Sequence, residues 1–277
     1  MKPLPFLNPA AGTPAVRNPG RPSVIVPTQA VDAEELTAQC AAAAATGVVD
    51  VIEWRIDPLL AQTGRDARAE DVLRLFPHAT AAGLPVLLTV RTAFEGGLVE
   101  ISESEYAEVV SRLIAGVANA AAESGESPAG RAGGDLGAPV ALDVEIDRAQ
   151  SQALIAAARE NGVPVVASHH NFTATDAPAE LRATFRRMDE AGADVAKVAM
   201  MPQEPSDVLH LLEATAEAAS SSSRPVLGIS MGPLGRTSRI MGADFGSCAS
   251  FAQIGLASAP GQIDAVRLAE ILDRVSD

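Results

Sequence analysis

Short apolar segments rich in β-branched residues alternate with longer, alanine-rich segments along almost the whole chain. The expected strands are Ser23–Pro27, Val49–Ile56, Pro85–Arg91, Val140–Ile146, Val163–His169, Asp194–Met200, Pro225–Ser230 and Ser250–Gly255. Helix-length segments lie between most of them, at residues 32–46, 67–82, 103–124, 149–161, 177–191, 205–221 and 263–275, with only a short helix near 235–243. This alternation predicts a parallel sheet that is buried on both faces.

The number of repeats limits the architecture further. Eight β-α units in 277 residues fit a closed (β/α)8 TIM barrel, which we expect to form one catalytic domain over residues 22–277. An open doubly wound sheet is the alternative fold, but no GxGxxG motif follows the first strand. Residues 1–21 are expected to form a flexible arm, and the glycine-rich segment Ser124–Ala138 is expected to be a surface loop.

Bulk properties restrict the partners and the compartment. The formal net charge of −14 argues against nucleic acid and anionic membranes, although a few converging arginines can still bind a small anion. No apolar run approaches the ~18 residues that a membrane-spanning helix needs. Cys40 and Cys248 lack the spacing of a disulfide framework or a metal site, so we expect no metal and a cytoplasmic protein.

Charged residues gather where the expected strands end. A charge in a buried strand costs several kcal/mol unless it is paired or faces a polar cavity. Any one pair, such as Glu53–Arg55 or Arg91–Glu95, could simply brace the mouth of the barrel. Five neighbouring strands share the pattern, however, and barrel enzymes build their sites at this end. The residues concerned are Glu53, Arg55, Arg91, Glu95, Asp143, Glu145, His169, His170 and Lys197.

Lys197 is the only lysine beyond the amino-terminal arm. Of 21 basic residues, 19 are arginine, and the other lysine is Lys2. A lysine can supply a neutral amine and an arginine cannot. Lys197 is therefore the candidate Schiff-base nucleophile, with Val195 and Ala199 as its neighbours on one strand face and with guanidinium groups expected nearby. A lysine at a strand end that extends its amine to solvent is the structural alternative.

The remaining polar residues offer an acid–base group and an anion clamp. His169 and His170 point to opposite faces of a strand, so one of them is expected to face the site, with Glu95 or Glu145 orienting it. The loops after strands seven and eight supply Arg236, Arg239, Ser258 and Gln262. Such loops often bind a carboxylate or phosphate.

Six segments carry a resemblance to a known family. They are EWRID (53–57), VRTAFEGG (90–97), SHHNF (168–172), ADVAKVAMMP (193–202), ISMGPLGRTSR (229–239) and ASAPGQI (257–263). In this order they resemble type I 3-dehydroquinate dehydratase, from about residue 22 to the carboxyl terminus. The last two segments, taken together, are the most specific.

The resemblance implies a role for each matching position. Lys197 corresponds to the imine-forming lysine, His170 to the acid–base histidine and Glu95 to its partner. The substrate-binding positions fall on Glu53, Arg55, Arg91, Arg239, Ser258, Gln262 and Phe251, with Arg239 expected on the substrate carboxylate. Two residues depart from the family pattern: Asn171 stands where Asp is common, and His169 is an additional histidine.

The implied reaction is dehydration of 3-dehydroquinate to 3-dehydroshikimate by syn elimination, without a cofactor, in a homodimer. The resemblance leaves shikimate biosynthesis and quinate catabolism both open. A class I aldolase on the same barrel is the enzymatic rival. A catalytically silent barrel that senses a shikimate-like ligand is the rival of another class, although such a protein has no need of both Lys197 and His170.

Overall fold

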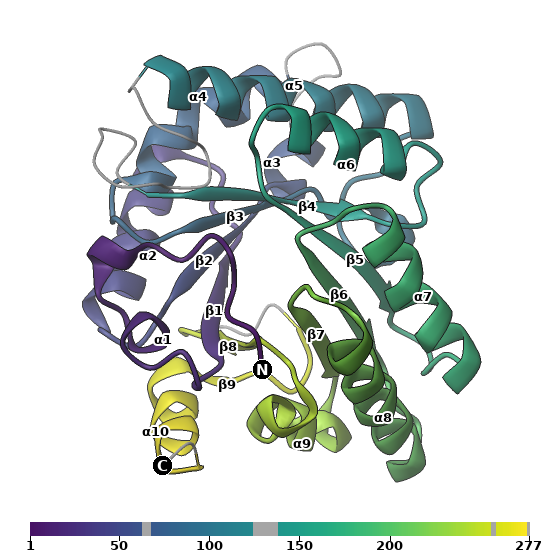
Figure 1. Cartoon of the computed structure of the whole chain (residues 1–277). Coiled ribbons are helices and arrows are strands. Elements are labelled where there is room, and N and C mark those ends of the chain that lie inside the picture. The colour runs from purple at the N-terminus through teal and green to yellow at the C-terminus, as the bar shows by residue number, and fades with distance from the viewer. Residues whose placement is uncertain (63–67, 124–137, 256–258, 276–277) are drawn as a thin grey trace.

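The alternation of strands and helices is confirmed in the computed structural model, which describes residues 1–62, 68–123, 138–255 and 259–275 (Figure 1). The strands are β1 (Ser23–Thr28), β2 (Val51–Arg55), β3 (Val86–Thr89), β4 (Val140–Glu145), β5 (Val165–Asn171), β6 (Val195–Met200), β7 (Val226–Ser230), β8 (Ala249–Gln253) and β9 (Ile263–Asp264). The helices of five or more residues are α2 (Ala33–Ala45), α3 (Asp57–Gln62), α4 (Arg68–Thr80), α5 (Glu103–Glu123), α6 (Ser151–Glu160), α7 (Pro178–Glu190), α8 (Pro205–Ser221), α9 (Arg236–Ile240) and α10 (Ala265–Val275). Shorter turns are η1 (Pro9–Ala11), α1 (Pro14–Arg17), η2 (Ala93–Glu95), η3 (Pro233–Gly235) and η4 (Gly242–Phe245).

The strands curl into a parallel barrel with the helices outside it (Figure 1). The sheet order is β7-β6-β5-β4-β3-β2-β1-β8-β9, so each strand from β1 to β7 lies beside its neighbour in the sequence. The ring closes between β7 and the start of β8, where Val226 and Ser247 form one bridge and Cys248 N donates to Val226 O at 2.8 Å. The (β/α)8 prediction is correct.

The carboxyl-terminal helix begins later than expected. The last helix begins at Ala265 and not at 263, because Ile263 and Asp264 pair with Ala252 and Gln253 as the short strand β9. The predicted loop Ser124–Ala138 falls mainly on 124–137, which lie outside the described residues.

Strand alternation divides the apolar core into two layers. In β1, Val24 and Val26 join the cluster between the strands and the helices, whereas Ile25 between them joins the cluster inside the barrel. The inner cluster takes a residue from the start of each strand, such as Val166 of β5 and Val195 of β6. Side chains two positions further along each strand therefore also point inward, toward the carboxyl end of the barrel.

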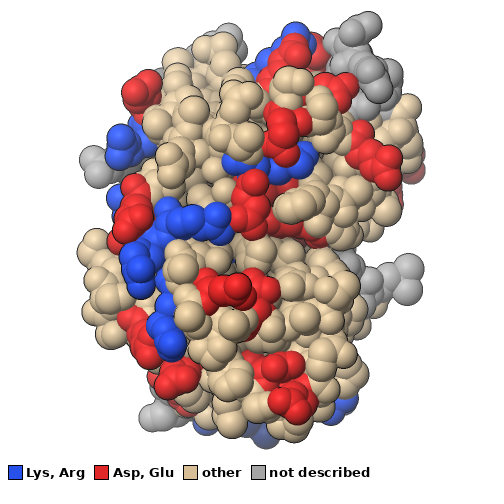
Figure 2. Space-filling view, turned by 90° about the vertical axis from the view of Figure 1, so that its right-hand side faces the viewer, with Lys and Arg blue, Asp and Glu red and all other residues tan. Residues whose placement is uncertain are grey.

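Acidic and basic side chains lie interspersed on the face that carries α7 and α8 (Figure 2). Arg182 of α7 lies 3.4 Å from Glu217 of α8, and Arg187 lies 2.7 Å from Asp147. Among the described residues, no helix is long and apolar enough to cross a membrane.

The segment before β1 covers the amino-terminal end of the barrel. Leu4 and Phe6 are buried in the inner apolar cluster, and Asn8 donates from its side chain to Gly83 O at 2.8 Å. Arg21 then pairs with Asp50 at 3.2 Å. From this packing we expect a fixed part of the barrel in place of the flexible arm that the composition of residues 1–21 suggests.

Phe6→Ala tests this expectation. Removing a fully buried aromatic side chain leaves a cavity, so we expect the free energy of unfolding to fall by about 3–5 kcal/mol. Leu209→Ala is the control, because Leu209 is 64% exposed and its truncation should change stability by no more than about 0.5 kcal/mol. Denaturant unfolding measures both. Equal stability of the two variants would mean that residues 1–21 form a loose arm.

Candidate active site

Polar side chains fill the upper half of the barrel interior. Above the apolar layer, the same inward positions carry Glu53 in β2, Asp143 in β4 and Lys197 in β6. The next inward position carries Arg55 in β2 and His170 in β5. The regular alternation of eight parallel strands thus brings residues that are distant in sequence to one end of the barrel.

A pocket of about 260 Å³ opens at this end. Eight of the expected site residues line it: Glu53, Arg55, Arg91, His170, Lys197, Arg239, Phe251 and Gln262. The other lining residues, which the sequence did not indicate, are mostly apolar: Gln29, Gly96, Leu98, Phe172, Ala199, Ile229, Met231 and Ala259.

Lys197 is buried inside the barrel in the middle of β6, with its amine between two carboxylates. Nζ lies 3.6 Å from Glu53 Oε1 and 3.6 Å from Asp143 Oδ2, and 4.5 Å from the centre of the Phe251 ring. The charged groups nearest this amine are carboxylates, and the expected guanidinium groups of Arg55, Arg91 and Arg239 line the same pocket. A cation at this position is therefore stabilised by two negative charges and an aromatic face.

His170 faces the pocket and is oriented by Glu95 from behind. Its Nδ1 lies 2.7 Å from Glu95 Oε2, which is buried in the turn η2. Burial, together with the charge of Arg91, lowers the pKa of His170 well below its usual value, so the imidazole is neutral near pH 7. Burial also raises the pKa of Glu95 to about 8. The pair is thus close to the ionisation range in which a general base operates.

Arg91 holds the carboxylates around this pair and is fully buried. Its Nη1 donates to Glu95 at 2.8 Å and to Glu145 at 3.0 Å, and its Nη2 donates to Asp143 at 2.7 Å. Glu145 accepts from the backbone and side chain of Thr92 instead of contacting the histidine. Between the two acids left open by the sequence, Glu95 is therefore the one that contacts His170.

Arg239 is a buried guanidinium without a carboxylate partner among the described residues. It donates only to backbone oxygens, of Phe251 and Pro260, both at 3.1 Å, and its Nε has no hydrogen-bond acceptor in that part of the chain. Burial lowers its pKa to about 10, which leaves it charged near neutrality. An unpaired buried cation in a pocket wall is a binding position for an anion.

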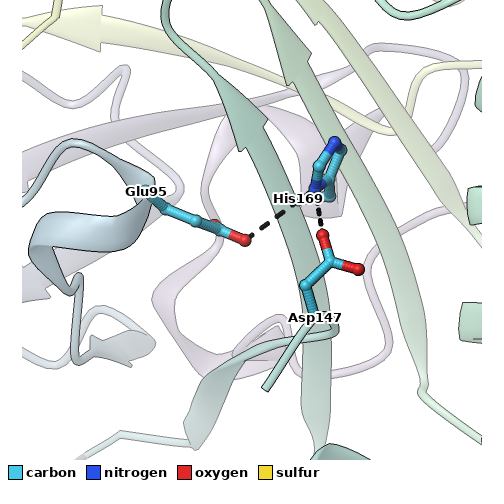
Figure 3. A group of neighbouring side chains, drawn as sticks. All are labelled: Glu95, Asp147 and His169. Atoms are coloured by element: carbon cyan, nitrogen blue, oxygen red, sulfur yellow. Dashed lines mark ion pairs between the residues drawn. The ribbon is translucent and has the colours of Figure 1, made fainter. Parts of the chain in front are cut away.

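His169 lies on the other face of β5, outside the pocket. Figure 3 shows Glu95 and Asp147 reaching its ring from two sides. Nδ1 lies 2.6 Å from Asp147 Oδ2, and Nε2 lies 2.9 Å from Asp176 Oδ2. One ligand-type atom from each of Glu95, Asp147 and His169 lies within 4.8 Å of the others.

Two expected residues, Arg236 and Ser258, are not placed in the pocket by the described structure, and Asp143 joins the site without an expected role. Arg236 is exposed at the start of α9 and does not line the pocket, so only Arg239 remains of the expected pair. Ser258 lies outside the described residues. No individual role was expected for Asp143 from the sequence, but the residue lies beside Lys197. Its position two residues before Glu145, on the same face of β4, could have indicated this.

Known proteins are similar to this chain in both sequence and architecture. The family model for type I 3-dehydroquinase matches residues 24–276. A 3-dehydroquinate dehydratase of Lactiplantibacillus plantarum is 39% identical over 216 residues, which are 77% of each chain. A catabolic 3-dehydroquinate dehydratase of Acinetobacter baylyi is 33% identical over 253 residues, which are 91% of this chain and 85% of the other.

A solved structure gives the same result for the fold. The type I 3-dehydroquinate dehydratase from Clostridium difficile, determined with covalently modified comenic acid, superposes with a TM-score of 0.77 at 28% identity. The superposition covers 93% of both chains. With a family model that spans almost its whole length and relatives above 30% identity, the chain belongs to the type I 3-dehydroquinase family.

Proposed function

We propose that this chain dehydrates 3-dehydroquinate to 3-dehydroshikimate, a step of the shikimate pathway, through an imine on Lys197. The observation that carries the proposal is that Lys197, His170 and Arg239 line one pocket. They supply an amine for a ketone, a neutral base for a carbon acid and an unpaired cation for a carboxylate. 3-Dehydroquinate contains the three matching groups: a ketone, an acidic proton on the neighbouring carbon and a carboxylate. The enzymes named as relatives act on the same compound.

The proposed reaction passes through an imine and an enamine on Lys197. The free amine of Lys197 adds to the C3 carbonyl, and the carbinolamine takes up one proton and loses water to give a protonated imine. His170 removes a C2 proton, the electron pair moves toward the imine carbon, and the resulting enamine expels the C1 hydroxyl, which leaves as water with the proton from His170. Hydrolysis of the protonated product imine restores the free amine of Lys197 and releases that proton, so one water is lost overall. Proton removal and return from one side by a single histidine produce a syn elimination.

The surroundings of Lys197 favour the central intermediate. The protonated imine is a cation, and Glu53 and Asp143 lie 3.6 Å from the nitrogen that carries it. Stabilising charge at the place where it develops is the largest contribution that many active sites make. Arg55 forms two hydrogen bonds with Asp57, at 2.7 and 2.8 Å, and is held against the pocket. We propose that Glu53, Arg55, Arg91, Phe251, Ser258 and Gln262 position the substrate ring.

Trapping with borohydride tests the imine. The protein is incubated with 3-dehydroquinate and sodium borohydride, digested and mapped by mass spectrometry. We expect a ligand-derived adduct on Lys197 and none on Lys2, the only other lysine. Absence of the Lys197 adduct would refute the proposed imine. Retro-aldol products without 3-dehydroshikimate would instead support the aldolase alternative.

The pH dependence of kcat/KM tests the His170–Glu95 pair. His170 can present a free Nε2 to the substrate while its Nδ1–H donates to an ionised Glu95. Because the pKa of Glu95 is raised to about 8, its carboxylate forms only as the pH rises through that value. We therefore expect kcat/KM to rise with pH to a plateau above about pH 8. Glu95→Gln should remove this fall in kcat/KM toward low pH, which we call the acid limb. An acid limb that persists in the variant would contradict the assignment.

We also propose that the enzyme is a cytoplasmic homodimer that uses neither a metal nor a dissociable cofactor. The imine itself provides the electron sink that a cofactor would otherwise supply. Sedimentation equilibrium tests the dimer, and unchanged activity after dialysis against a chelator tests the independence from metal.

A further inference from the structure

His169 is held between two carboxylates that are themselves fixed. Arg187 of α7 donates to Asp147 at 2.7 Å, and Asp147 lies 2.6 Å from Nδ1 of the ring. On the other side, Asp176 lies 2.9 Å from Nε2. A ring with a carboxylate at each nitrogen carries a proton on both, because each nitrogen then acts as a donor.

Asn171 completes the arrangement. Its side-chain amide donates to the second oxygen of Asp176 at 2.9 Å, while its own oxygen accepts from the backbone of Thr173 and Ala174, both at 3.0 Å. An aspartate at position 171 has no hydrogen to donate and would repel Asp176. The two departures from the family pattern, His169 and Asn171, thus act on the same carboxylate.

The charge on His169 persists at neutral pH. Burial alone would lower its pKa, but the hydrogen bonds to Asp147 and Asp176 raise it to about 9. The pKa of Asp147 is correspondingly lowered to about 2, chiefly by its hydrogen bond to His169. The side chain is therefore mainly an imidazolium below about pH 9, which covers the range in which kcat/KM is expected to rise.

This imidazolium faces the one oxygen of Glu95 that has no other partner. Oε2 of Glu95 contacts His170 and Arg91, but the buried Oε1 accepts no hydrogen bond from the described residues. Nδ1 of His169 lies 3.9 Å from Oε1 (Figure 3). Other charges act on the pair from neighbouring elements: Arg91, Asp143 and Glu145 on Glu95, and Arg91, Lys197 and Arg55 on His170.

We infer that His169 is a positioning residue: its fixed positive charge holds Glu95 as the carboxylate that orients His170. The inference rests on the proposed function, because it concerns the same acid–base pair. Of the groups around Glu95, Asp143 and Glu145 favour its protonated form, and Arg91 is shared among three carboxylates. His169 supplies a second cation from the side that Arg91 leaves open.

A divalent metal ion is the alternative occupant of this position. Two ligands at about 2.0–2.1 Å from a tetrahedral ion stand roughly 3.3 Å apart. Nδ1 of His169 and Oδ2 of Asp147 are only 2.6 Å apart, which is too close for two ligands of one ion and fits a direct ion pair. The geometry therefore favours the imidazolium.

His169→Asn tests the inference through the pH profile of kcat/KM. An opposite charge within about 4–6 Å lowers the pKa of a carboxyl by one unit or more, so we expect the acid limb to move about one pH unit higher. Activity at pH 7 should fall up to about tenfold, while the high-pH plateau stays near that of the wild type. His169→Arg keeps the charge and is expected to restore the limb. His78→Asn, the same substitution on α4, is the matched control.

Several outcomes would overturn the inference. An unchanged acid limb with a uniformly lower plateau in His169→Asn would show a merely structural role. A wild-type limb that a chelator moves to the position of His169→Asn would show that a metal supplies the charge. Should His169→Asn fail to fold, Asp176→Asn must shift the limb in the same direction. A wild type without dehydratase activity would refute the proposed function. If the wild type is active but the acid limb stays at the same pH in the variants, only the role of His169 is refuted.

Discussion

Lys197→Met is expected to lower kcat roughly 10⁴-fold or more, as removal of a covalent nucleophile does in other enzymes that form covalent intermediates. Methionine keeps the length and the apolar stem of the side chain but cannot form an imine. The rest of the pocket, including the unpaired guanidinium of Arg239, is unchanged, so a substrate carboxylate still has its partner. We therefore expect turnover to disappear while binding of 3-dehydroquinate stays measurable by calorimetry.

The only other lysine provides the control for this variant. Lys2 donates to the backbone oxygen of Ala219 at 2.6 Å, far from the pocket in the fold, so Lys2→Met should keep wild-type kcat. Circular dichroism and thermal unfolding of both variants separate chemistry from folding. A Lys197→Met enzyme within tenfold of wild-type kcat would show that the imine does not lie on the reaction path.

Sequence periodicity was sufficient to predict the barrel and the end at which the polar pocket opens. The reason is physical: a parallel strand buried on both faces has an alternating pattern, and a polar residue within it must face a cavity or a partner. Lys197 was identified first by the scarcity of lysine, and the strand face that it was expected to share with Val195 and Ala199 strengthened the prediction. In the structure, both of these neighbours belong to the inner apolar cluster.

Properties that depend on three-dimensional neighbours could not be predicted from the periodicity alone, although the family resemblance indicated His170. The choice between His169 and His170 depends on the register of β5, which is set by Val166 pointing inward at the other end of the strand. The carboxylates beside Lys197 come from β2 and β4, and nothing in the local sequence of β6 indicates them. Burial of Phe6 was unexpected because a Pro- and Gly-containing segment has no periodicity to interpret.

Arg91→Met is expected to lower the free energy of unfolding by about 3–5 kcal/mol at pH 8, because it leaves three buried carboxyl groups without their shared cation. These groups are Asp143, Glu95 and Glu145, each within 3.0 Å of the guanidinium. Arg112→Met is the control. Arg112 pairs with Glu70 and Glu108 at 2.8 and 2.6 Å, but it is 47% exposed, so its loss should cost less than about 1 kcal/mol.

The pH dependence of this deficit distinguishes lost charge pairing from lost packing. In the wild type, Arg91 and Lys197 hold the pKa of Asp143 below its usual value although burial opposes them. Without Arg91, the folded-state pKa of Asp143 rises above its unfolded value, and the pKa of Glu95, which burial already raises to about 8, rises further. The folded variant then binds more protons than the unfolded chain, so its stability rises as the pH falls. Denaturant unfolding at pH 8 and pH 5 should therefore show the deficit shrinking at the lower pH. A deficit of equal size at both values would mean that Arg91 stabilises the barrel by filling space, and that its charge has no part in holding Glu95 and Asp143 beside His170 and Lys197.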